Sequence, residues 1–232
     1  MIYHVIPVII VVELIVIGFT IKCRRINSYN KRCDFTTEFN NKFFDFVNET
    51  FSSYRIDNNK YSAVIMEVDK IQQELGMDGV LSSFYDPDPL HGVQGRNYQL
   101  FMNIMPEIRY AVSERDNIII MERINQLMGV CEDALKRHIG NLERAIENEK
   151  KGLFNPITCL GEGIRWLVGL PVDILCWAGL YSAVRSQKIK VSTIFKIISN
   201  IIVVIGLISS IVTIALGWDE FLIMLRNCIG RK

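Results

Sequence analysis

Two apolar runs near the ends of the sequence constrain this chain more than any other feature. They cover residues 5–21 and 197–218, and a more polar stretch with helical periodicity lies between them. Each run is close to the roughly 20 residues that cross the hydrocarbon core of a bilayer as a helix. The sequence therefore predicts a membrane-anchored, all-α protein with transmembrane helices over residues 1–22 and 194–218 and a short tail over 219–232.

Basic residues follow the first run rather than precede it. They gather at Lys22 and in a juxtamembrane collar over residues 23–33. A cleavable signal peptide carries its positive charge before the apolar region, so the order here predicts an uncleaved anchor. Short flanks rich in Lys and Arg stay in the cytoplasm. We therefore expect a multi-pass protein of a bacterial-type cytoplasmic (inner) membrane, with the N-terminus outside and the helical domain in the cytoplasm.

A third apolar segment, residues 158–185, has a different character. It combines charged residues, two tryptophans and a helix breaker, namely Arg165, Asp173, Trp166, Trp177 and Pro171. This combination favours a helix that lies in the membrane interface, or one that enters the membrane and returns. A third transmembrane crossing remains the alternative, because the flanking charge bias can be overridden. The choice decides on which side of the membrane the C-terminus lies.

Glu13 is the one charged residue of the first apolar run. An ionisable group at the centre of a span costs roughly 2.5–3.5 kcal/mol and usually faces protein. We expect helix packing between the terminal spans around Glu13, Gly206, Ser209 and Ser210, because small residues four apart permit close approach. The alternative is a protonated Glu13 that lipid tolerates. Aromatic residues expected at the membrane interfaces are Tyr3, Trp166, Trp177 and Trp218.

The middle of the chain, residues 34–152, predicts one cytoplasmic bundle of helices with coiled-coil character. Its helical stripes are Phe35, Phe39, Phe43 and Phe46, then residues 61–75 between an Asn58 or Asn59 cap and Gly76, then residues 98–112, where Pro106 is expected to bend or restart the helix. The longest stripe runs from Ile120 to Ile146 after a capping box at Ser113, and this helix would extend roughly 50 Å at about 1.5 Å per residue. The phenylalanines are expected in the core rather than in a ligand pocket. No strand is predicted.

Chemistry-bearing motifs are few. The segment from Asp86 to His91 offers two carboxylates and an imidazole, but its alternating Pro, Asp and Gly are also what a tight turn requires. We interpret it as a turn, because it supplies neither a complete ligand set nor an oriented triad. The six cysteines show no CxxC spacing, and nucleotide, hydrolase and zinc-protease motifs are absent from the sequence. The sequence thus predicts no enzyme, no cofactor and no metal site.

The order of elements resembles that of bacterial LemA-type membrane proteins. The resemblance covers about residues 2–156 and consists of a bare N-terminal span, a basic collar and a helical bundle whose long helix ends before Phe154-Asn155-Pro156. It implies a helical bundle at a bacterial inner membrane, and it carries over no catalytic residue. The Trp-rich segment and the C-terminal span depart from that pattern.

These features favour a non-enzymatic integral membrane protein whose cytoplasmic helices serve protein–protein interaction or self-assembly. Its partners would be the lipid bilayer and either a second copy or another protein, and a net charge of +1 predicts no nucleic acid. The alternative is a membrane-perturbing effector, or pore-former, activated by oligomerisation of the helical domain. Glu13, Arg165 and Asp173 would then line a polar path.

Overall fold

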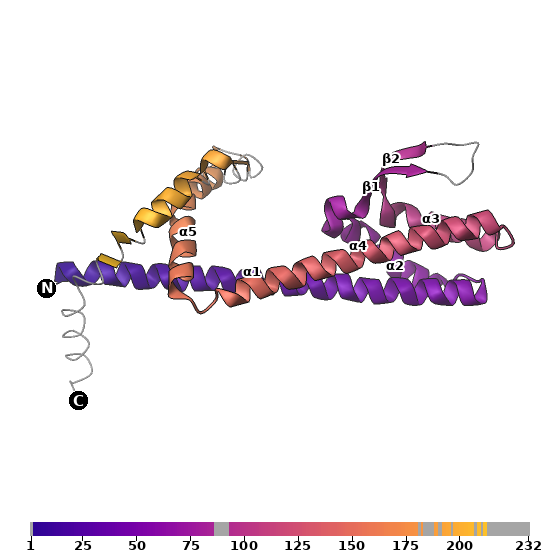
Figure 1. Ribbon diagram of the computed structural model, residues 1–232, viewed down its shortest axis with the longest axis horizontal. Coiled ribbons are helices and arrows are strands. Elements are labelled where there is room, and N and C mark those ends of the chain that lie inside the picture. The colour runs from indigo at the N-terminus through magenta and orange to yellow at the C-terminus, as the bar shows by residue number, and fades with distance from the viewer. Residues whose placement is uncertain are drawn as a thin grey trace, which may run out of the picture. The chain divides into compact units, whose positions relative to one another are not determined.

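The computed structural model describes residues 2–85, 93–180, 182, 188–189, 192–195, 197–206, 208–209 and 211–212. Its elements are, in order, α1 (Ile2–Ser53), α2 (Asn58–Leu75), the short 3-10 helix η1 (Gly76–Gly79), β1 (Val80–Tyr85), β2 (Val93–Gln99), α3 (Leu100–Ser113), α4 (Ile118–Lys151) and α5 (Pro156–Trp177) (Figure 1). Helices dominate, so the predicted fold class is confirmed at the level of a mostly helical protein. The chain divides into two compact units, unit 1 with Met1–Asn27 and Glu147–Lys232, and unit 2 with Ser28–Ile146.

Unit 2 is a bundle of helices around an aromatic core. Phe39, Phe43 and Phe46 of α1 are buried, as predicted, and Phe35 packs at the edge of the same core. The Phe101 ring on α3 meets the rings of Phe39 and Phe43 edge-on, with centroids 5.3 and 5.5 Å apart. Edge-to-face pairs at this separation are favourable beyond the area that they bury. The phenylalanine stripe therefore belongs to the core, and α3 is the element that closes over it.

Helix ends in unit 2 follow the capping rules with small shifts from the sequence prediction. Asp57, rather than Asn58 or Asn59, caps α2, because its side chain accepts hydrogen bonds from the backbone N–H groups of Asn59 and Lys60. Gly76 ends α2 as predicted, with φ of 55°, a conformation that favours glycine. The predicted capping box at Ser113 is wrong. Asn117 instead accepts from the N–H groups at the start of α4.

Two helices are more continuous than the sequence suggests. No break separates the apolar start of α1 from its phenylalanine stripe, and the helix runs for 52 residues. Pro106 lies inside α3 rather than at a restart. Pro106 is on the exposed side of α3, where water can satisfy the carbonyl group that loses its helical N–H partner. Within α4, Ile124, Cys131, Leu135, Leu142 and Ile146 of the predicted stripe are buried.

A β-hairpin joins α2 to α3, which the sequence analysis did not predict. β1 and β2 pair antiparallel, with Val80 opposite Gln99 and a register shift between Phe84 and Tyr85. Six- and seven-residue strands with mixed polar and apolar faces give only a weak periodic signal, so the pattern was missed. The segment from Asp86 to His91, interpreted as a turn, lies outside the described residues.

Gln72 of α2 ties both ends of this hairpin to the bundle. Its side-chain amide donates to the carbonyl oxygen of Gly79 at 2.8 Å, and the backbone N–H of Phe101 donates to its Oε1 at 3.0 Å. Gln99, the residue before α3, offers that helix no side-chain cap. Gln72 thus supplies from a neighbouring helix the acceptor that the first turn of α3 needs.

Replacing Gln72 by leucine should therefore destabilise unit 2. The change leaves a buried N–H and a buried carbonyl without partners, at about 1–3 kcal/mol for each group. We expect a loss of about 2–4 kcal/mol in the free energy of unfolding, measured by urea denaturation of the full chain followed by circular dichroism. Gln73→Leu is the matched control, because Gln73 is exposed and bonds only Asp69 among the described residues. Equal stability of the two variants would contradict this role of Gln72.

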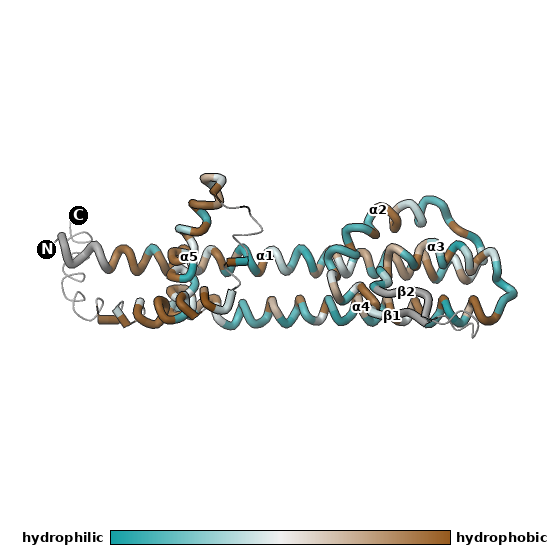
Figure 2. Tube along the Cα trace, turned by 90° about the horizontal axis from the view of Figure 1, so that it is seen from above, coloured by the Kyte–Doolittle hydropathy of each residue, from teal (hydrophilic) through white to brown (hydrophobic). Residues whose placement is uncertain are grey.

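Unit 1 contains the first part of α1, the end of α4, α5 and further helical residues at 197–206. Its small apolar cluster consists of Val11, Leu160, Ile164 and Val203. Figure 2 shows apolar residues along the first part of α1 and along α5. Within the described part of the chain, none of the helices combines the length and the apolar composition that a membrane crossing requires. The transmembrane helices therefore stay a prediction.

Candidate functional site

The helices α1 and α5 cross in unit 1 with their backbones almost in contact. A Cβ atom added to Gly18 of α1 would lie 1.8 Å from the carbonyl oxygen of Cys159 on α5. A Cβ atom added to Gly163 of α5 would lie 2.1 Å from the carbonyl oxygen of Leu14 on α1. Each helix therefore uses a glycine to admit the backbone of the other. Small residues at the contact point are typical of helix pairs that pack in membranes.

Large apolar side chains point outward around this crossing. The exposed set on α1 and α5 includes Ile9, Ile10, Val12, Val16, Trp166, Leu167, Ile174, Leu175 and Trp177. Side chains of this size normally lie inside a protein that is surrounded by water. In unit 1 glycines allow the closest approach of α1 and α5, and the small cluster of Val11, Leu160 and Ile164 is buried, whereas the large apolar residues named above form the surface. Exposed apolar surface on this scale marks an interaction site for protein or lipid.

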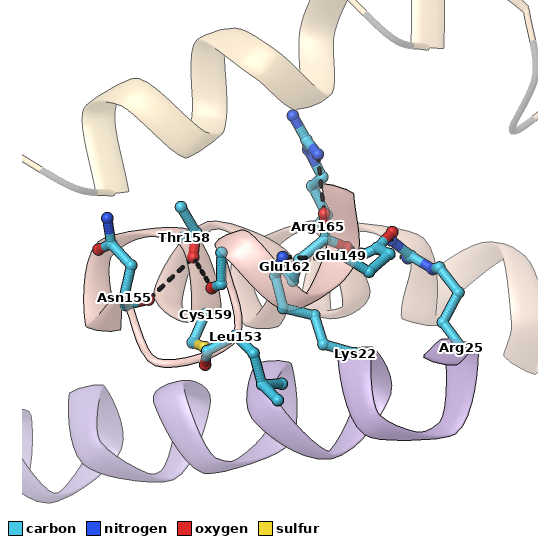
Figure 3. Close-up of polar contacts among 10 residues, drawn as sticks. Lys22, Arg25, Glu149, Leu153, Asn155, Thr158, Cys159, Glu162 and Arg165 are labelled. Carbon is cyan, nitrogen blue, oxygen red and sulfur yellow. Dashed lines mark hydrogen bonds and ion pairs between the residues drawn. The ribbon is translucent and has the colours of Figure 1, made fainter. Parts of the chain in front are cut away.

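A cluster of charged residues lies beside the crossing (Figure 3). Glu149, near the end of α4, accepts from Arg25 at 2.6 Å and from Lys22 at 3.3 Å. Arg25 also reaches Glu162 of α5 at 3.2 Å, and Glu162 pairs with Arg165 at 3.0 Å. The two carboxylates are largely buried, with side chains 17 and 16% exposed. The cluster joins α1, α4 and α5 through ion pairs between oppositely charged partners.

The electrostatics of this cluster favour its charged forms. Burial raises the pKa of Glu149, but the hydrogen bonds and charges of Arg25 and Lys22 outweigh burial and hold the pKa below its usual range. Burial likewise opposes the charge on Arg25, yet Glu149 and Glu162 raise its pKa above the ordinary value. Partly buried pairs of this kind are screened by salt much less than exposed ones. The cluster is suited to hold helices together rather than to transfer protons near neutral pH.

Removing the charge of Glu149 should weaken unit 1 in a pH-dependent way. Because the pKa of Glu149 is lowered by folding, its contribution is present above its unfolded pKa and is lost as pH falls through the folded value. We expect Glu149→Gln to lower the free energy of unfolding by about 1–2 kcal/mol at pH 7. This loss is smaller than that expected for a fully buried pair, because Arg25 is partly exposed. The difference from wild type should shrink below about pH 4.5, the ordinary value for this carboxyl.

Thermal unfolding of the full chain in detergent at pH 7 and pH 3.5 measures this difference. Glu147→Gln is the matched control, because Glu147 lies two residues away and pairs with Lys151 on the exposed face of α4. Exposed pairs contribute little to stability. A Glu149→Gln effect that is equally large at both pH values would contradict the assigned role of the charge.

The turn between α4 and α5 is fixed by local hydrogen bonds (Figure 3). Asn155 caps α5 by accepting from the backbone N–H of Ile157, and Pro156 occupies the first turn of α5, where its missing N–H costs nothing. The hydroxyl of Thr158 donates to the carbonyl oxygens of Gly152 and Asn155. The Phe154-Asn155-Pro156 sequence thus marks a precise helix boundary that positions Glu162 relative to Glu149.

The predicted membrane-packing residues lie in different surroundings. Gly206 lies against α5, where an added Cβ atom would be 2.9 Å from Cδ1 of Ile164. Glu13 and Ser209 are exposed, while Ser210 lies outside the described residues. The helix that contacts α1 by backbone approach is α5, through Gly18 and Gly163. Neither glycine was predicted as a packing residue, although a glycine within an apolar run is a sequence signal for close helix approach.

The other predicted positions are distributed as follows. Arg165 pairs with Glu162 and donates to Asn200, and Asp173 is exposed on α5. Trp166 and Trp177 are exposed, the latter by 90%. Trp218 lies outside the described residues, as does the side chain of Tyr3. Of the charged cluster, the sequence analysis noted Lys22 and Arg25 only as parts of a basic flank, and it missed Glu149 and Glu162 as their partners.

Unit 2 holds a second polar cluster. Glu74 of α2 accepts from Nε of Arg32 at 2.7 Å and contacts Nε2 of His138 at 2.9 Å. His138 is buried between the helices, where the carboxylate of Glu74 gives its imidazole a partner away from water. Over the described ranges, no group of three His, Cys, Asp or Glu side chains is placed to hold a metal ion.

Comparisons with known proteins assign this chain to no family. No family model, no curated protein and no solved structure matches this chain.

Proposed function

We propose that this chain is a non-enzymatic integral membrane protein that presents the helices of unit 2 for protein–protein interaction or self-assembly. The outward-facing apolar surface of α1 and α5 around the Gly18–Gly163 crossing is the observation that supports this proposal. Apolar surface of this extent is stable in lipid, whereas in water it would drive aggregation. Only the stretch of α1 before Lys22 is apolar, so we propose that this stretch, and not the rest of α1, is inserted into the bilayer.

The charged cluster is consistent with a membrane boundary at the end of this stretch. Lys22 and Arg25 follow the apolar part of α1 directly, and they pair with Glu149 and Glu162 rather than extend into an apolar surface. Charged side chains that flank an apolar span commonly lie at the level of lipid headgroups. We place the N-terminus outside and unit 2 in the cytoplasm of a bacterial-type membrane by the charge bias of this flank. The resemblance to LemA-type proteins belongs to the same proposal.

Membrane fractionation tests the proposal. We expect the full chain to sediment with membranes, to resist extraction by alkaline carbonate and to require detergent for solubilisation. A matched variant replaces Val12 and Val16, two exposed residues of α1, by lysine. This variant should lose carbonate resistance, because each charge within an apolar span costs roughly 2.5–3.5 kcal/mol. A wild-type chain that stays dissolved and monodisperse without detergent would refute membrane insertion.

Glu13 gives a specific reason to keep the second candidate function. It is a charged residue on an exposed face of α1 that is otherwise apolar. A charge that faces lipid is costly, so assembly of several copies around Glu13, Arg165 and Asp173 would produce a polar path through the bilayer. Release of a trapped dye from liposomes by wild type, and its loss in Glu13→Leu, would favour this membrane-perturbing function. Intact liposomes would exclude it.

A further inference from the structure

A cavity of about 480 Å³, open to solvent, lies on the surface of unit 2 between α1 and α4. Asn40, Phe44 and Asn48 line it from α1, four residues apart, and Asn125, Gly129 and Glu132 line it from α4. Residues three or four apart share one face of a helix, so two facing stripes form the walls. The volume is in the range of small-molecule sites. Phe44 also packs against the aromatic core through Phe43, and none of the set belongs to the charged cluster of unit 1.

One of the lining residues has a polar atom that needs a hydrogen-bond donor. Oδ1 of Asn40 is buried and has no hydrogen-bond partner among the described residues. A buried acceptor without a partner costs about 1–3 kcal/mol, so such atoms in folded proteins call for an explanation. A ligand that donates a hydrogen bond into the cavity would satisfy this oxygen.

The charged and apolar groups that line the cavity indicate which chemical class of ligand could supply that hydrogen-bond donor. Among the described lining residues none is basic, and Glu132 supplies the one carboxylate. The ring of Phe44 offers a π face, and carboxamides at Asn48 and Asn125 can accept further hydrogen bonds. Gly129 leaves space, since a Cβ atom added there meets nothing within 4 Å. This wall repels anions and suits a cation with an aliphatic body.

The chain already places an ammonium group on Glu132. Nζ of Lys136 donates to Oε1 of Glu132 from one helical turn away, and this partner raises the pKa of Lys136. The Lys136 side chain is 64% exposed, so the pair is weak and open to exchange. An external ammonium ion would compete with Lys136 for the same carboxylate.

We propose that this cavity is a binding site for a small primary ammonium ligand, whose charged group contacts Glu132 and Asn40 and whose aliphatic part lies against Phe44. This inference does not depend on the proposed membrane function, because every residue it uses belongs to unit 2.

Calorimetric titration of the full chain in detergent with n-butylammonium tests the site, with n-butanol as the uncharged control ligand. We expect saturable binding of n-butylammonium and no binding of n-butanol. The affinity for n-butylammonium should be at least tenfold weaker in Gly129→Leu, because the added side chain fills the cavity. Lys136→Met should bind severalfold more tightly, because it removes the internal competitor. Circular dichroism of each variant verifies that it is folded.

Two matched variants complete the design. Gly140→Leu adds the same side chain to α4 at another open position, and Lys151→Met removes a lysine from another four-residue ion pair of that helix. Both should bind n-butylammonium as wild type does. The proposal is overturned by absent or unsaturable binding, by equal binding of n-butanol, or by unchanged affinity in Lys136→Met. If instead the wild type forms dimers, Gly129→Leu forms monomers and neither binds ammonium, the cavity would be assigned to a second copy of this chain.

Discussion

Gly163→Ala should drive α1 and α5 apart. The added Cβ atom would lie 2.1 Å from the carbonyl oxygen of Leu14, and this neighbour is backbone that no rotamer change can move. Inserting even one methyl group into a tight contact typically costs 1–3 kcal/mol, and the rigid neighbour here places the expected loss at about 3 kcal/mol or more. Spin labels on Val16 and Leu167, both exposed, should report a longer distance between the two helices in the variant.

Gly161→Ala is the matched control for this prediction. It makes the same change two residues earlier on α5, where the added Cβ atom would lie 3.7 Å from Val203, an ordinary contact distance. Alanine also favours helix over glycine by about 1 kcal/mol, so this variant should be as stable as wild type or more so. If Gly163→Ala matched Gly161→Ala in thermal stability and in label distance, the close crossing would not exist.

Phe101→Ala should unfold unit 2 or bring it close to unfolding. Phe101 is fully buried, and its ring meets Phe39 and Phe43 edge-on, so truncation leaves a large cavity at the centre of the core. Phenylalanine-to-alanine changes in a core cost about 3–5 kcal/mol. This is a large share of the 5–15 kcal/mol that typically stabilises a domain. Chemical denaturation of the full chain measures this loss of stability, with helix content followed by far-UV circular dichroism.

Met102→Ala tests whether this loss comes from burial. Met102 is the next residue of α3 and is 43% exposed, so we expect a change below about 1 kcal/mol. Comparable losses in the two variants would mean that α3 does not close the aromatic core in the way described.

The helices of unit 2 were predictable because their signals are local. The phenylalanine stripe of α1 has the helical spacing that a buried face requires, and Gly76 ends α2 because glycine readily adopts a positive φ. The long stripe of α4 likewise predicted one continuous helix. In each case the relevant energy comes from residues within one or two turns, which a single sequence displays directly.

Features that depend on distant partners were missed. The hairpin needs Gln72 of α2 to satisfy groups at both of its ends, and His138 is buried because Glu74 lies on another helix. The Gly18–Gly163 crossing joins residues far apart in sequence, and Lys22 and Arg25 find their carboxylates beyond residue 146. Pairings of this kind are set by tertiary packing, and local periodicity does not encode them.

Solvent accessibility of labels on the exposed apolar residues is the most direct test of the central claim that unit 1 faces lipid. Spin labels at Val16 and Leu167 would be compared in lipid nanodiscs with labels at Met66 and Met77 of unit 2, which are 77 and 84% exposed. We predict that the first pair collides with oxygen and is shielded from a water-soluble nickel chelate, whereas the second pair shows the reverse. Free access of the nickel chelate to all four positions would contradict membrane insertion of unit 1.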